Sequence, residues 1–125
     1  MKQMIVVTLS FAVSAVLAGT SYWTGDGGDG KWSTAANWSP SAPVAGDNVV
    51  LSNKTDDVLI IDNDADGTEV NQLSFATSSF GKRIELRGKK ITVRANGIIQ
   101  LCPDKPHVYA PIDCLGDFTL RGIEW

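Results

Sequence analysis

Short apolar runs rich in Ile and Val recur between residues 48 and 120, and they constrain the fold more than any other feature of the chain. Gly, Asn, Asp, Ser or Lys separates one run from the next. The runs are Asn48–Leu51, Asp57–Ile61, Val70 with Leu73–Phe75, Ile84–Leu86, Ile91–Val93, Ile98–Leu101 and Phe118–Leu120. Such runs are typical of β-strands, and no window beyond Ala18 keeps the apolar period of a helix. The sequence therefore predicts an all-β fold.

Two seven-residue units follow each other without a gap, Gly81–Arg87 (GKRIELR) and Gly88–Arg94 (GKKITVR). Each unit places two apolar side chains on one face of a strand and a polar one, Glu85 or Thr92, on the other. The glycine of each unit supplies a bend before the next strand. The two strands form either a β-hairpin, with a tight turn at Gly88, or successive sides of one solenoid coil.

Wider spacings favour the solenoid. Apolar positions recur from Leu73 to Ile91 and from Ile98 to Phe118, which approximates one coil of about 20 residues. In a solenoid, the inward Val, Ile, Leu and Phe side chains form a continuous apolar column, and each coil pairs only with its neighbours.

An irregular stretch from Tyr22 to Leu51 holds three of the four Trp residues of the chain. It reads Trp23-Thr24-Gly25, a Gly/Asp-rich loop, then GKWSTAANW over residues 30–38, followed by Pro43 and Gly46-Asp47. This order resembles the opening segment of secreted bacterial β-helix proteins of the autotransporter-associated repeat type. The resemblance implies a right-handed parallel β-helix with an aromatic cap at residues 19–47 and short coils at residues 48–125. It implies an exported surface scaffold and names no ligand or reaction.

The opening segment, Met1 to Ala18, has the features of a signal-peptide helix. Lys2 precedes an apolar run from Met4 to Leu17, and Val16-Leu17-Ala18 supplies the small residue at a cleavage site. The run is shorter than the roughly 20 apolar residues that cross a bilayer. We therefore expect cleavage after Ala18, no stable membrane span afterwards, and a location outside a bacterial cell or at its surface.

Trp23, Trp32 and Trp38 have two alternative roles. The first coil of a solenoid leaves an apolar end and unpaired backbone groups, which need a cover. Three large aromatic side chains are suited to that task, because each buries much apolar surface. Alternatively, the three rings form an exposed platform for sugar rings.

Acidic residues suggest calcium as an alternative to a plain solvated turn. Asp62, Asp64 and Asp66, followed by Gly67, match the start of a D-x-D-x-D-G calcium loop. The position of the bidentate Glu holds Leu73, so we expect no metal site and keep calcium as the alternative. The loop Asp26–Gly30 offers a poorer match.

Cys102 and Cys114 are predicted to form a disulfide, because exported thiols tend to oxidise. Metal binding by these two residues with His107 is the alternative, although the spacing matches no standard zinc pattern.

Charge is unevenly distributed. Six acidic and no basic residues lie from Asp56 to Glu69, whereas six basic residues lie from Lys82 to Arg94 with only Glu85 against them. These are either solvated turn residues of successive segments or a basic face for anionic polysaccharide. The net charge of −3 argues against a nucleic-acid partner.

Catalytic motifs such as G-x-S-x-G and H-E-x-x-H are absent from the sequence, so we do not expect an enzyme. The predicted function is an exported structural or adhesive scaffold, with polysaccharide or cell-surface components as its partners. A small carbohydrate-binding β module is the alternative, and a remnant of a β-helical polysaccharide lyase is the third interpretation. The strand-like segment Phe118–Trp125 leaves open whether the chain is a fragment.

Overall fold

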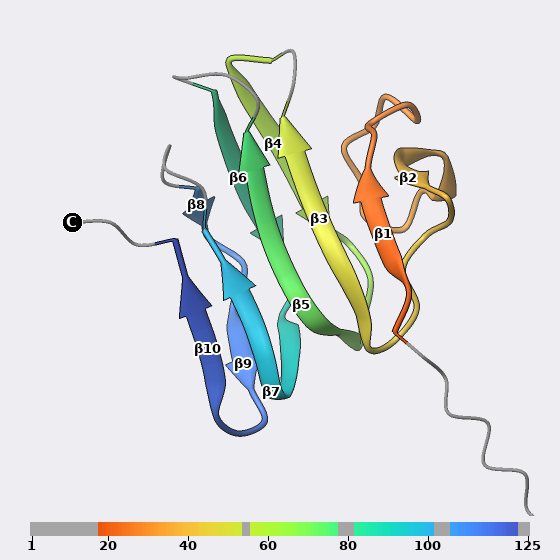
Figure 1. Ribbon diagram of the computed structural model, residues 1–125. Helices are drawn as coiled ribbons and strands as arrows, with labels where there is room; N and C mark the ends of the chain where they lie inside the picture. Colours follow the sequence, from red (N-terminus) through yellow and green to blue (C-terminus); the bar gives the residue numbers. More distant parts are fainter. Residues whose placement is uncertain (1–17, 54–55, 78–81, 102–105, 123–125) are drawn as a thin grey trace, which may run out of the picture.

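The computed structural model describes residues 18–53, 56–77, 82–101 and 106–122. Within them the protein is nearly all β without an α-helix, and its parallel strands stack as a β-solenoid of about four turns (Figure 1). The predicted fold class is confirmed. The expected signal-peptide helix falls on residues 1–17, which lie outside the described part of the chain.

Two sheets form opposite sides of the solenoid. The strands are β1 (Thr20–Trp23), β2 (Trp38–Ser39), β3 (Asp47–Asn53), β4 (Val58–Asn63), β5 (Thr68–Thr77), β6 (Arg83–Gly88), β7 (Ile91–Gln100), β8 (His107–Val108), β9 (Ile112–Cys114) and β10 (Phe118–Arg121), with a short 3₁₀ turn, η1, at Ala35–Asn37. The first sheet has the order β10-β7-β5-β3-β1-β2, with β9 also paired to β7, and the second has the order β4-β6-β8. Neighbouring strands are parallel except for β1 and β2.

The tandem units lie on successive sides of one coil. The first unit contains β6, in the smaller sheet, and the second contains β7, in the larger sheet. The chain turns between them at Gly88, whose φ of 98° is readily adopted only by glycine. The apolar side chains of both units are fully buried, as the alternation predicts. The hairpin alternative is therefore wrong, and the solenoid prediction is confirmed.

The coils are longer than the sequence spacing predicts. Val49 pairs with Leu73, 24 positions later, and Leu73 pairs with Ile99, 26 positions later. The expected match of Leu73 with Ile91 is wrong, because Ile91 pairs with Thr68 and the register shifts between Val70 and Gln72. Phe118 pairs with Gly97, one residue from the expected partner.

The core is a column of aliphatic side chains between the two sheets. Along β3 every second residue is buried, as expected of a strand with one face inward. Fully buried members include Val49, Leu51, Ile61, Leu73, Ile84, Leu86, Ile91 and Val93. Burying each such side chain stabilises the fold by roughly 1.5–3 kcal/mol before conformational entropy is counted.

Candidate functional site

The Trp-rich stretch folds back over the first strand of the solenoid. β1 pairs with β3 on one side and with the antiparallel β2 on the other, where Trp23 lies opposite Trp38. The rings of Trp23 and Trp38 meet edge to face with centroids 5.0 Å apart, and those of Trp32 and Trp38 are 4.8 Å apart. The three side chains are only 3–5% exposed. They form part of the core and no exposed aromatic row.

The indole nitrogens of Trp38 and Trp23 differ in their hydrogen bonding. Trp38 Nε1 donates a hydrogen bond to the carbonyl oxygen of Trp32 over 2.7 Å. Trp23 Nε1 is buried without a hydrogen-bond partner. The surrounding loops therefore supply an indole acceptor for Trp38 and not for Trp23.

The same stretch also covers part of the first edge of the smaller sheet. The amide of Trp32 donates to the carbonyl of Asp62, and the amide of Asp62 donates to the carbonyl of Gly30, both over 2.8 Å. Ser33 adds its amide and hydroxyl as donors to the Asp64 carboxylate, at 2.9 and 2.6 Å. Both hydrogen bonds lower the pKa of Asp64. The bond from the Ser33 hydroxyl is the larger cause, and the bond from the Ser33 amide is the second. These contacts join the opening stretch to β4 and the turn that follows it.

Asp29 organises the Gly/Asp-rich loop. Its carboxylate accepts hydrogen bonds from the Thr34 hydroxyl (2.5 Å), the Asn37 side chain (2.8 Å) and the Lys31 amide (3.0 Å). Asn37 is fully buried and accepts a bond from the Gly27 amide. The Thr34 hydroxyl is the largest of the causes that lower the pKa of Asp29 to about 2.

These contacts predict an acid-sensitive loop. The pKa of Asp29 is lower in the folded than in the unfolded chain. Its hydrogen bonds therefore stabilise the fold above about pH 4, and this contribution is lost as the pH falls towards 2. We expect Asp29→Asn to be less stable than the native protein at pH 7, and the difference to shrink between about pH 4 and pH 2. Urea unfolding over this range measures it. Asp26→Asn, an exposed site on the same loop, is the control, and a difference independent of pH would contradict the assignment.

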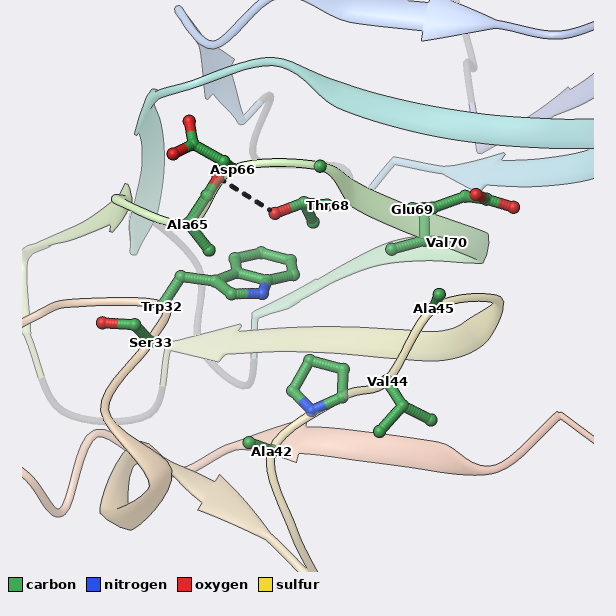
Figure 2. Close-up of a pocket in the computed structure, with 12 residues that line it drawn as sticks. Trp32, Ser33, Ala42, Val44, Ala45, Ala65, Asp66, Thr68, Glu69 and Val70 are labelled. Atoms are coloured by element: carbon green, nitrogen blue, oxygen red, sulfur yellow. Dashed lines mark hydrogen bonds between the residues drawn. The ribbon is translucent and has the colours of Figure 1, made fainter.

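A cavity of about 270 Å³ lies beside Trp32. Its walls come from the 42–45 loop, the 65–68 turn and the start of β5 (Figure 2). Pro43, Val44 and Val70 give it apolar surface, and Asp66 and Glu69 add carboxylates. The indole ring of Trp32 lies between the loop and the turn, with its nitrogen towards the space between Val70 and Val44. This nitrogen has no hydrogen-bond partner among the described residues.

The cavity could take a small group that combines apolar surface with a hydrogen-bond acceptor. Its carboxylates already have partners, because Asp66 pairs with Lys89 at 2.9 Å and Glu69 pairs with Arg94. The Trp32 indole N–H is a side-chain donor at this site that has no partner among the described residues.

Comparisons with protein-family models, with curated proteins and with solved structures found no match. The site is therefore interpreted from its own geometry. No helix among the described residues is long and apolar enough to cross a membrane.

The three calcium candidates do not converge on one point. Asp64 binds Ser33, Asp66 pairs with Lys89, and Asp62 is an exposed residue of β4. No group of three or more Asp, Glu, His or Cys side chains suited to a metal ion occurs in the described part of the chain. The Asx-rich turn instead ties the opening stretch to the next coil.

The predicted disulfide is not seen. Cys114, in β9, is a free, half-buried thiol that packs against the core as a small apolar side chain. Cys102 lies outside the described residues. His107 is exposed on β8, where its Nδ1 lies 3.5 Å from the Tyr109 hydroxyl.

Ion pairs explain the uneven charge of the sequence. Pairs between the acidic and the basic segment join residues 23 to 25 positions apart: Asp57 with Lys82, Asp66 with Lys89, and Glu69 with Arg94. Within β6, the buried Glu85 pairs with Arg87 and Arg83, and Arg87 is the main cause of its lowered pKa. Carboxylates thus lie beside most of the basic side chains. Exposed pairs of this kind contribute at most about 1 kcal/mol each.

Proposed function

We propose that this chain is an exported structural scaffold, the capped first coils of a passenger-like β-helix with no catalytic role. The observation that carries the proposal is the packing of Trp23, Trp32 and Trp38 into the end of the first coil. A closed end suits an element that must stay folded outside a cell, because an open solenoid end is a template for aggregation. Adhesion to cell-surface components is part of this proposal.

The rest of the described surface supports a scaffold better than a polyanion-binding face. The basic side chains of residues 82–94 lie beside carboxylates of the preceding and following coils. The β-solenoid core is continuous, and its coils are linked by parallel strand pairing on both sides. Such a molecule resists deformation and presents loops at regular intervals.

One observation favours a second candidate, a carbohydrate-binding module. The Trp32 indole N–H faces a cavity of about 270 Å³ and has no partner in the described residues. The acetamido group of an N-acetylated sugar combines a methyl group with a carbonyl acceptor. Pro43 and Val44 could contact the methyl group while the indole N–H donates to the carbonyl oxygen.

One experiment on exported protein tests both candidates. The chain is expressed in a bacterium, the exported form is purified, and its mass is measured. We expect the mass of residues 19–125, and a mass that includes Met1 would contradict export with cleavage. The indole ¹H–¹⁵N signals are then followed while N-acetylglucosamine is added to about 50 mM. This concentration saturates a site whose dissociation constant lies in the millimolar range, where binding is weak.

The scaffold proposal predicts no saturable shift of the Trp32 signal. A saturable shift of the Trp32 signal and of the backbone amide signals of Val44 and Val70, with the amide shifts lost in Trp32→Phe, would establish the sugar site instead. Trp32→Phe removes the donor and retains an aromatic ring, so its unfolding midpoint reports whether the fold is kept.

A further inference from the structure

Asp47 is a buried carboxylate that has no basic partner among the described residues. It is the first residue of β3 and is 8% exposed. Its Oδ2 accepts a hydrogen bond from the Val44 amide over 2.9 Å, which closes a tight turn. The Arg94 guanidinium lies beside Gly46 but pairs with Glu69. Burial of a carboxylate without a counter-charge lowers the stability of the fold.

The other carboxylate oxygen of Asp47 faces the backbone nitrogen of Gly19. This nitrogen donates a hydrogen bond to Asp47 Oδ1 over 3.1 Å. The carbonyl of Gly19 accepts a hydrogen bond from the Asn48 amide over 2.8 Å, directly before the pairing of β1 with β3 begins at Thr20. The nitrogen of Gly19 therefore has a fixed place beside the carboxylate, although Gly19 itself is exposed.

We propose that Asp47 is the acceptor for the α-ammonium group that cleavage after Ala18 creates at Gly19. The inference rests on the proposed export with cleavage at that bond. Hydrolysis adds one water across the peptide bond, so that Ala18 leaves as a carboxylate and the nitrogen of Gly19 becomes an ammonium group, whose ordinary pKa is about 7.7–8.0. The atom that donates to Asp47 Oδ1 as a neutral amide then carries a positive charge.

Cleavage thus supplies the counter-charge that the buried carboxylate lacks. A hydrogen bond between charged groups is roughly twice as strong as one between neutral groups. The uncleaved precursor has only the neutral bond, so the start of β1 is held more weakly in the precursor than in the mature chain. Because β1 carries the buried Trp23, the ion pair also holds the Trp-rich stretch in place.

Acetylation of the Gly19 amine tests the contribution of the charge alone. The exported protein is purified, and its mass identifies the first residue. The α-amine is acetylated in urea at about pH 6.5, where it is the most reactive amine, and the protein is refolded. The acetyl group restores the neutral amide of the precursor. We expect acetylation to lower the ratio of folded to unfolded protein about fivefold, because a neutral donor replaces a charged one.

Asp47→Asn is the matched variant, because it keeps an acceptor oxygen and loses the charge. Acetylation of this variant should change the ratio of folded to unfolded protein by less than about twofold, since the two changes remove the same interaction. Urea unfolding of the four proteins, native and variant, with and without the acetyl group, gives the ratios.

A second measurement needs no variant. The rate at which the Gly19 amine is acetylated is compared between the folded and the urea-unfolded native protein. Lys31 is the control, because its side chain is exposed and forms no ion pair within the described part of the chain. We expect the Gly19 amine to react roughly tenfold more slowly in the folded protein, as a rise of one unit in its pKa would cause, while the Lys31 rate changes by less than about twofold.

The outcomes separate this inference from the proposed export. A mass that begins at a residue other than Gly19 would overturn the inference together with the proposed cleavage site. A chain that begins at Gly19 but has the same stability with and without the acetyl group, or equal acetylation rates when folded and unfolded, would overturn the inference alone. An equal loss of stability in Asp47→Asn would also overturn it. If Asp47→Asn does not fold, the acetylation rates of the native chain decide.

Discussion

Replacement of Asn63 by Ala is expected to lower the free energy of unfolding by roughly 2 to 4 kcal/mol, because it leaves several buried polar groups without partners. Asn63 is fully buried at the end of β4. Its amide nitrogen donates to the carbonyls of Lys89 (3.0 Å) and Lys90 (3.4 Å), and its oxygen accepts from the Thr68 hydroxyl at 3.0 Å. One side chain thus joins the corner of its own coil to that of the next.

Urea unfolding of Asn63→Ala measures the effect. Asp62→Ala, an exposed site one residue earlier on β4, is the matched control and should change the free energy by no more than about 0.5 kcal/mol. Equal, small effects in both variants would show that Asn63 does not hold the corner.

The alternation of apolar residues was sufficient to predict the fold class and the two sides of the coil. Ile84, Leu86, Ile91 and Val93 have the period of a strand, and all four are completely buried. Local pattern could not choose between a hairpin and a coil. That choice depends on partners that are distant in the sequence, such as Leu59 opposite Ile84.

Coil length was predicted poorly because turns and bulges change it without changing the apolar pattern. The register shift in β5 places Gln72 opposite Ile98 while Val70 lies opposite Val93. The two strands therefore differ in the number of residues they use over the same span. Spacing between apolar residues cannot reveal such an irregularity.

The candidate site was predicted in part. The Trp residues of the opening stretch could be identified from the sequence, because each has a large apolar side chain that is stable when buried. Asp29 and Asn37 were missed as a pair, because each has an ordinary residue type for a turn and their contact is made within an irregular loop. The position of Asn53 and Asn63 at the ends of β3 and β4 is a signal that could have indicated buried corner residues.

Trp38→Ala is expected to have the largest effect of any single change considered, a loss of roughly 3 to 5 kcal/mol in the free energy of unfolding, as for other buried large aromatics. Trp38 contacts both other rings and donates the hydrogen bond to the Trp32 carbonyl. Its removal opens a cavity between the rings and loosens the cover of β1, so aggregation should also increase.

The central claim, that buried tryptophans close the first coil of the scaffold, is tested most directly by urea unfolding of Trp38→Ala beside Tyr22→Ala. Tyr22 lies on the same strand pair as Trp23 and Trp38, is aromatic, and is 51% exposed. The account predicts a much lower unfolding midpoint for Trp38→Ala and a midpoint close to the native one for Tyr22→Ala. A native midpoint for Trp38→Ala would contradict the cap and remove the main support for the proposed scaffold.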